Sequence, residues 1–244
     1  MKRIRILGLA MLALFAFGAV VAATAAAEEK EPAGLLFLEK EGPPVKFEGK
    51  GGEASLTTLP GGAKIVCVAN TFTATAGVKG ETHVTLGTTT ITFTGCKFAE
   101  TIACSSETEA GVKDAKEVIL VEADLHFVSL ETAAGKLVPG LFVMLLKDVL
   151  LNCGGTKILV LGVAIGEIEK ASATADVTEI GLNFVAIPKL LACDKNDKLC
   201  KEEKEKFACA ASGSLCANVG GTEEPADQVA KATVKISPMV LIDF

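Results

Sequence analysis

Short runs of β-branched residues separated by glycine fill most of this chain, and they restrict it to a mainly β fold. The clearest run spans residues 88–94, in which threonines at the even positions alternate with Thr89, Ile91 and Phe93. A period of two is typical of a strand that buries one face. The runs do not alternate with long amphipathic helices, so the pattern predicts antiparallel pairing. We therefore expect an antiparallel β-sandwich or a partly closed barrel.

The same pattern predicts further strands along the chain. They cover residues 65–68, 71–75, 88–94, 117–130, 141–146, 157–168, 179–187, 229–237 and 239–244. Together they indicate a single β domain from 53 to 244, which ends in closing strands at 223–244. The preceding segment, 28–52, mixes acids, lysines, prolines and glycines. We predict a flexible arm there, with at most one edge strand.

A cysteine-rich insert at 189–222 interrupts the series of strands. Lysine and glutamate dominate residues 201–206, and Asp197 precedes them as a candidate helix cap. This composition predicts a short helix from 197 to 211. We expect the insert to cover one end or one edge of the sheet.

The first 27 residues have the layout of a secretory signal peptide. Three cations, Lys2, Arg3 and Arg5, precede an apolar run at 6–21 and small residues that end at Ala27. We predict cleavage after Ala27 and secretion of the mature chain. No later stretch has the roughly 18 uninterrupted apolar residues that a spanning helix needs, so no membrane span is expected after signal cleavage.

The charge of the mature chain excludes some partners. The signal carries the chain's only arginines and no acids, so its removal makes the net charge more negative than the −6 of the full chain. Nucleic-acid binding depends on clustered cations that neutralise phosphates, and arginine is well suited to that contact. An acidic mature chain without arginine is therefore not expected to bind nucleic acid. Tryptophan and tyrosine, which are common at protein interfaces, are also absent.

All the cysteines of the chain follow the signal, and their number is even. In an oxidising compartment such a set predicts disulfides throughout. Structural zinc sites use pairs separated by about two residues, whereas no two cysteines lie that close here. We therefore favour disulfides over metal at all of these positions: Cys67, Cys96, Cys104, Cys153, Cys193, Cys200, Cys209 and Cys216.

The pairing of these cysteines is a hypothesis, because many connectivities are possible. The first four cysteines fall in the strand-rich body and the last four in the insert. The predicted helix would separate Cys200 from Cys209 by about 13 Å along its axis, which is too far for a bond. The simplest set of pairs is Cys67–Cys96, Cys104–Cys153, Cys193–Cys200 and Cys209–Cys216.

Glu122, Asp124 and His126 occupy alternate positions of the predicted strand 117–130, so their side chains would project from one face. Three such side chains could bind a divalent metal, or pair a base with a carboxylate. Alternation alone also places them there, opposite an apolar face. We favour a solvated sheet face without metal or cofactor. A secreted hydrolase that uses His126 with Asp124 or Glu122 is the alternative.

The other histidine, His83, falls on a predicted strand surface. A Ser-His-Asp or Cys-His site would need His83 or His126, and no G-x-S-x-G elbow is present. We therefore expect a protein without catalysis.

Threonines repeat at alternate positions within 73–75 and 90–94. On a flat sheet such positions form ranks of hydroxyls, an arrangement that secreted ice-binding proteins use. Threonine is also simply favoured on strand surfaces, and these ranks lack a fixed repeat. Binding to ice or to another solid surface is a second alternative.

Five short segments carry a family resemblance: Lys2–Arg5, Ala63–Cys67, Thr92–Cys96, Cys104–Ser106 and Asn152–Gly155. In this combination they resemble a group of small, uncharacterised exported proteins of soil actinobacteria. The resemblance covers the mature body up to about Ile168. It implies a secreted, β-rich, cysteine-bridged protein, and it implies no catalytic residues. The insert between Cys193 and Cys216 departs from the pattern of the group.

These observations predict an exported, acidic, disulfide-bridged β protein without catalysis. We expect a structural or interaction role at or outside the cell surface. The sequence names no partner, and components of the cell envelope are the candidates that this location suggests.

Overall fold

The computed structural model of the protein describes residues 37–38, 45–59, 61–76, 85–107, 111, 115–132, 137–169, 177–184, 191–193, 215–240 and 242–243. Within these residues every regular element is a β-strand and none is a helix. All strand pairs are antiparallel, so the predicted mainly β, antiparallel fold is confirmed. The predicted signal peptide and the predicted helix at 197–211 lie outside the described residues.

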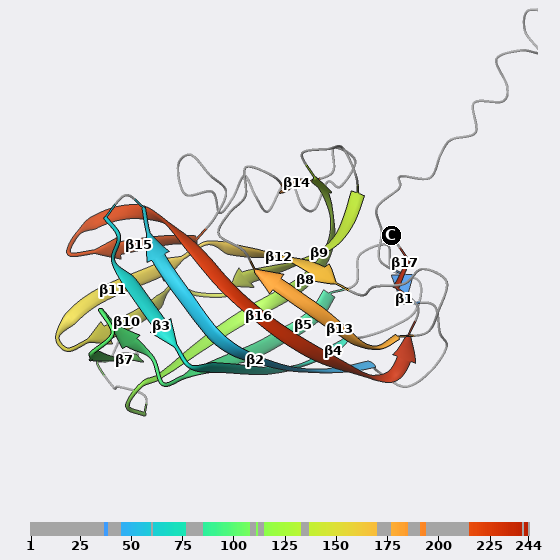
Figure 1. Ribbon diagram of the computed structural model, residues 1–244, viewed down its shortest axis with the longest axis horizontal. Helices are drawn as coiled ribbons and strands as arrows, with labels where there is room; N and C mark the ends of the chain where they lie inside the picture. Colours follow the sequence, from blue (N-terminus) through green and yellow to red (C-terminus); the bar gives the residue numbers. More distant parts are fainter. Residues whose placement is uncertain are drawn as a thin grey trace, which may run out of the picture. The chain divides into compact units, whose positions relative to one another are not determined.

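The strands are numbered in chain order (Figure 1). Their bounds are Phe37–Leu38 (β1), Val45–Thr58 (β2), Lys64–Cys67 (β3), Ala69–Ala76 (β4), Thr85–Thr94 (β5), Lys97–Phe98 (β6), Ile102–Ser106 (β7), Val118–Thr132 (β8), Leu137–Leu145 (β9), Val149–Cys153 (β10), Thr156–Leu161 (β11), Val163–Glu169 (β12), Val177–Phe184 (β13), Leu191–Cys193 (β14), Leu215–Val219 (β15), Thr222–Val240 (β16) and Ile242–Asp243 (β17).

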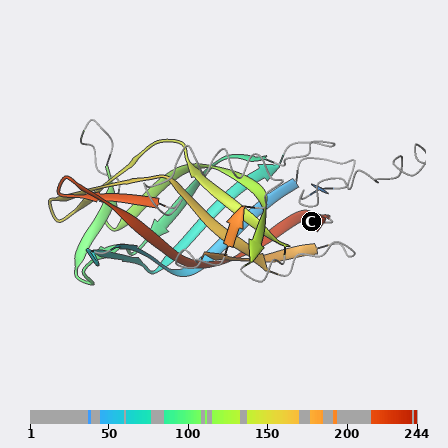
Figure 2. The same ribbon diagram turned by 90° about the horizontal axis from the view of Figure 1, so that it is seen from above.

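Strands β2 to β16 form one sheet, while β1 and β17 form a separate pair. The order in the large sheet is β14-β8-β5-β4-β2-β3-β6-β7-β10-β11-β15-β16-β13-β12-β9. Two additional pairings, β8 with β9 and β2 with β16, join strands that are distant in this order. The sheet therefore curls round and closes on itself (Figure 1, Figure 2). It is not a simple barrel, because β2, β8 and β16 each have three partners.

The long ladder between β2 and β16 divides the sheet into two ends. At the long-strand end, β2 and β16 are continued by β4, β5, β8, β9, β12 and β13, and these strands close a circuit. At the disulfide end, the same two strands are continued by β3, β6, β7, β10, β11 and β15, which close a second circuit. Both circuits share the β2–β16 ladder, so it forms the spine of the fold.

A β-bulge in β2 marks the point where one circuit gives way to the other. Gly51 pairs with Asn70 of β4, whereas Ala54 pairs with Cys67 of β3. The Asn70 Nδ2 donates to the carbonyl oxygen of Gly52 at 3.2 Å and so satisfies the bulged backbone. A Cβ on Gly51 would lie 2.4 Å from the Asn70 amide. Glycine is therefore required where β2 changes partner.

The core lies on the inner face of the curled sheet. Large side chains from both ends are almost fully buried there, including Phe47, Leu125, Ile158 and Val234. The rings of Phe47 and Phe127 lie 5.9 Å apart with their planes tilted. A second, smaller apolar cluster is formed by Leu130, Val138, Phe142 and Val163.

The boundary of the predicted arm at 28–52 differs from the structure, because Val45 begins β2 and residues 45–52 belong to it. Charged residues at the even positions, such as Lys46 and Glu48, face outward. Their presence in the sequence is the reason that a flexible arm was predicted here. Its inward positions include Gly49, where a Cβ would lie 2.0 Å from the ring of Phe72. The close ring explains why a buried strand position carries no side chain.

Candidate functional site

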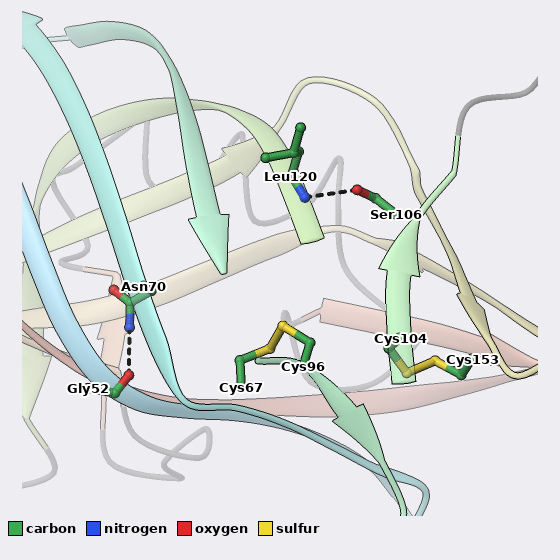
Figure 3. The surroundings of a disulfide bond; sticks show 8 residues. All are labelled: Gly52, Cys67, Asn70, Cys96, Cys104, Ser106, Leu120 and Cys153. Carbon is green, nitrogen blue, oxygen red and sulfur yellow. Dashed lines mark hydrogen bonds between the residues drawn. A yellow bond between two sulfur atoms is a disulfide. The ribbon is translucent and has the colours of Figure 1, made fainter. Parts of the chain in front are cut away.

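The disulfide end is held by two described disulfides, Cys67–Cys96 and Cys104–Cys153 (Figure 3). All four cysteines are buried. Cys104 and Cys153 face each other directly across β7 and β10. Both pairings that were expected in the body of the chain are therefore confirmed.

The pairing in the insert lies largely outside the described residues. Cys216 is also disulfide-bonded, and no cysteine among the described residues is free. Its predicted partner, Cys209, is outside the described part of the chain, as is Cys200, so Cys193–Cys200 and Cys209–Cys216 remain predictions.

A buried carboxylate lies next to the Cys104–Cys153 bridge. The Glu107 side chain is only 7% exposed and forms an ion pair with Lys157. It also accepts a hydrogen bond of 2.7 Å from Asn152 Nδ2. The Asn152 Oδ1 in turn accepts from the backbone N–H of Gly155 at 3.0 Å, which fixes the turn between β10 and β11. These partners are what a buried charge needs, and they give this cluster a structural role.

Glu122, Asp124 and His126 occupy one face of β8, as predicted. Their neighbours Ala123, Leu125 and Phe127 are buried, whereas the first three are exposed or partly exposed. The face points away from the main core, but it is not uniformly polar, because Leu130 on the same face packs with Phe142, the β9 partner of His126, in the second apolar cluster. His83, the other histidine, lies outside the described residues.

Each of the two acids on this face is occupied by another contact. The Glu122 carboxylate forms an ion pair with Lys147 at 2.9 Å, in which both side chains are well exposed. The Asp124 Oδ1 accepts a hydrogen bond of 2.9 Å from the Thr88 hydroxyl. In the described part of the chain, no three histidine, cysteine or acidic side chains are grouped as metal ligands would be. The shared strand face alone does not build a site.

A cavity of about 110 Å³ lies among the inward-facing side chains of the curled sheet. It was not predicted from the sequence. Inward-facing hydrophobic residues along its wall are only partly buried, which shows that the interior is not filled. They are Leu56, Phe72, Phe93, Val121 and Leu145.

The cavity arises because one part of its wall consists of small side chains. Ala54, Ala164, Ala230 and Ala232 line it and contribute only methyl groups. Two of them, Ala230 and Ala232, face inward from β16, the spine of the fold. Closed sheets of this size either fill with side chains or hold one small ligand. Here the alanines line the same space as leucines and valines of β8 and β9, and this space stays open.

Polar groups are few in the cavity wall. Apart from Ser55, the polar side chains among the lining residues are the amides of Asn70 and Gln228, and no lining residue is charged. Asn70 is buried and donates to Gly52 at the bulge. Gln228 is partly buried and has no hydrogen-bond partner among the described residues. A largely apolar cavity with a few polar groups is the usual form of a small-molecule site.

The threonine ranks predicted on two strands lie next to each other on the outer face. Thr71 of β4 pairs with Thr92 of β5, so the ranks are in register. The outward positions 71, 73, 75, 88, 90 and 94 are exposed, and position 92 is partly exposed. We call these seven residues the threonine face. Thr89 lies between Thr88 and Thr90 in the sequence, but its side chain points inward. Its hydroxyl donates a hydrogen bond of 2.6 Å to the carbonyl oxygen of Thr73.

No protein-family profile, curated protein or solved structure matches this chain. Its function is therefore argued from the geometry of the cavity and of the outer face.

One signal for the cavity was present in the sequence. The inward positions 226, 228, 230, 232 and 234 of β16 carry alanine at three of the five. A strand that turns mostly alanine toward a core leaves room in it. The sequence could not show that large side chains fail to fill that room, because this depends on which strands face each other.

Proposed function

We propose that the chain is exported and acts at or outside the cell surface as a non-catalytic interaction protein that binds a small apolar molecule in its cavity. The single observation that carries this proposal is the unfilled apolar cavity inside a closed sheet. Burial of apolar surface would provide the binding free energy, at about 25 cal/mol per Å². The ligand does not need a permanent entrance, because strands of folded proteins open locally and transiently.

One finding supports the proposed location. Stable disulfides are typical of oxidising compartments outside the cytoplasm, and both Cys67–Cys96 and Cys104–Cys153 are buried in the core. None of the described residues forms a helix suited to crossing a membrane. The signal peptide at 1–27 remains a prediction that the mass of the exported chain would test.

The non-catalytic part of the proposal is supported by the contacts of the outer acids. A general base must be free to reach a substrate proton, whereas Glu122 and Asp124 already bind Lys147 and Thr88. Substitution of His126 by alanine would leave any activity on ester, peptide and glycoside substrates unchanged. A hydrolytic activity that this substitution abolishes would instead establish the alternative, a hydrolase.

The binding proposal is tested with a narrow, rod-shaped apolar fluorescent probe such as diphenylhexatriene. We expect the probe to gain fluorescence with the wild-type protein and to lose most of this gain with Ala230→Leu, which fills the cavity. The matched control is Val229→Leu, because Val229 is 42% exposed and points outward from the same strand. A wild-type protein that leaves the probe dark, or an Ala230→Leu variant that binds it as well as wild type, would overturn the proposal.

The threonine face favours a second candidate function, binding to an ordered solid surface such as ice. The register between β4 and β5 places hydroxyls and methyl groups in two neighbouring ranks, at the regular spacings of a sheet. We expect inhibition of ice recrystallisation, and its loss in Thr73→Tyr. The control, Thr101→Tyr, alters an exposed turn at the disulfide end. Wild-type protein without effect on ice would remove this candidate.

A further inference from the structure

We infer that the cavity selects an uncharged molecule with a single narrow hydrocarbon chain and one hydrogen-bonding group, such as a long-chain alcohol or a fatty-acid amide, and that Gln228 binds that group. This inference rests on the proposed function, because it names the ligand class of the same cavity. Four features of the wall lead to it: its length, its lack of charge, the position of Gln228 and the different state of Asn70.

The wall of the cavity is long. On β8 it extends from Ile119 to Leu125, and on β9 it extends from Leu141 to Leu145. A strand rises by about 3.4 Å per residue, so the wall along β8 covers about 20 Å. A small volume spread over such a length is narrow. It suits an extended hydrocarbon chain better than a compact ring system.

The wall carries no ionisable side chain. None of the residues that line the cavity is an aspartate, glutamate, lysine, arginine or histidine. A carboxylate or an ammonium group would therefore enter without a counter-ion, and such burial is unfavourable. A fatty acid in its ionised form is a poor ligand for this cavity, whereas a neutral head group avoids the penalty.

Gln228 is the residue of the cavity wall that we expect to bind the polar head group of the ligand. It lies on β16 between the inward-facing Ala226 and Ala230, and it faces Leu56 on β2. The side-chain amide offers two donors and one acceptor, and none of them has a partner among the described residues. Gln228 is also the only glutamine of the chain. An apolar ligand would remove this amide from water without a compensating hydrogen bond, which is unfavourable.

Asn70, the other amide in the wall, is in a different state. Its Nδ2 already donates to the carbonyl of Gly52 (Figure 3), and the residue is only 5% exposed. Its substitution would disturb the bulge of β2, so it is a structural residue. Gln228 is thus the amide that a head group can bind without displacing an existing bond.

The test compares three ligands of equal chain length: 1-decanol, decane and decanoate at pH 8. Each displaces diphenylhexatriene from the wild-type protein and from Gln228→Leu, with Gln228→Met as a second variant of similar size. We expect wild type to bind 1-decanol about tenfold more tightly than decanoate and severalfold more tightly than decane. In both variants 1-decanol should lose its advantage over decane, because the amide that binds the hydroxyl and penalises decane is absent.

The outcomes separate this inference from the proposed function. Equal affinity of wild type for all three ligands, or tightest binding of decanoate, would overturn the selection of a neutral head group while the cavity remains a binding site. Unchanged binding of 1-decanol by folded Gln228→Leu or Gln228→Met would overturn the role of Gln228. Failure of all three ligands and of the probe itself would overturn the proposed function as well.

Discussion

The two ends of the sheet reach the same closed arrangement by different means. The six strands of the long-strand end, β4, β5, β8, β9, β12 and β13, have 7 to 15 residues each. The six of the disulfide end, β3, β6, β7, β10, β11 and β15, have only 2 to 6. Both disulfides whose two cysteines the structure describes join strands or turns of the disulfide end.

The difference shows how strand length and covalent bonds substitute for each other. A short strand contributes few ladder hydrogen bonds and little buried area, so its pairing is weak by itself. A disulfide limits the conformations of the unfolded chain and stabilises such a region without further residues. The long strands form more hydrogen bonds and apolar contacts, so their pairing is stable without such a disulfide. We therefore expect the two ends to respond differently to the same treatments.

The largest effect should come from the removal of a disulfide. Cys104→Ala/Cys153→Ala opens a loop of 49 residues, and we expect the free energy of unfolding to fall by about 4 kcal/mol. Cys67→Ala/Cys96→Ala opens a loop of 29 residues and should cost slightly less. Denaturation by urea, followed by circular dichroism, measures both.

Hydrogen exchange then locates the loss. In Cys104→Ala/Cys153→Ala we expect faster amide exchange in β7, β10 and β11, with β5 and β8 still protected. Equal acceleration at both ends would contradict the division of the sheet into two differently stabilised regions.

At the long-strand end the largest loss should follow from a cavity in the core. Ile180 of β13 is 2% exposed, and we expect Ile180→Ala to lower the free energy of unfolding by about 3 kcal/mol. Thr178→Ala is the matched control, because Thr178 is exposed on the same strand and its loss should cost less than about 0.5 kcal/mol. Similar losses in the two variants would mean that β13 is not packed as described.

Two turn asparagines allow a smaller and more direct comparison. Asn152 is buried and bonds both Glu107 and the N–H of Gly155. Asn218 only accepts from the N–H of Gly221 at an exposed turn. We expect Asn152→Ala to cost about 2 kcal/mol and Asn218→Ala about 0.5 kcal/mol, because only the first leaves a buried carboxylate short of a donor. Thermal denaturation distinguishes them, and the reverse order would be inconsistent with these contacts.

The smallest effects concern the two ion pairs. Lys147 and Glu122 are both exposed, so Lys147→Ala should change the free energy of unfolding by less than about 0.5 kcal/mol. Lys157→Ala should cost about 1 kcal/mol, since it removes the ion pair of the buried Glu107 carboxylate with Lys157 while Asn152 still donates to that carboxylate. High salt should weaken the first pair more than the second.

The same contrast explains how much of the fold was predictable. Strands of the long-strand end carry several periods of alternation, and residues 88–94 and 117–130 were predicted as β5 and β8 close to their observed bounds. Strands β7, β10 and β15 were missed, because each has only 5 residues and no clear period. The predicted strand at 157–168 is instead broken at Gly162, which has a positive φ of 108°.

The candidate site was predictable only on its outer face. The outward position of Glu122, Asp124 and His126 follows from strand alternation, which is a local property. The cavity depends on the pairing of β2 with β16, whose residues are far apart in sequence. The alanines of β16 indicate room in the core, but no local pattern reveals that the large side chains of β8 and β9 leave that room open.

The order of the two described disulfides has a consequence for how the chain is oxidised. Cys67 bonds the next cysteine in sequence, Cys96, and Cys104 likewise bonds the next one, Cys153. The two covalent loops therefore follow one another and neither encloses nor crosses the other. In a chain that enters an oxidising compartment with its N-terminus first, an oxidase that joins cysteines as they emerge would form both native bonds, without an isomerase to correct them.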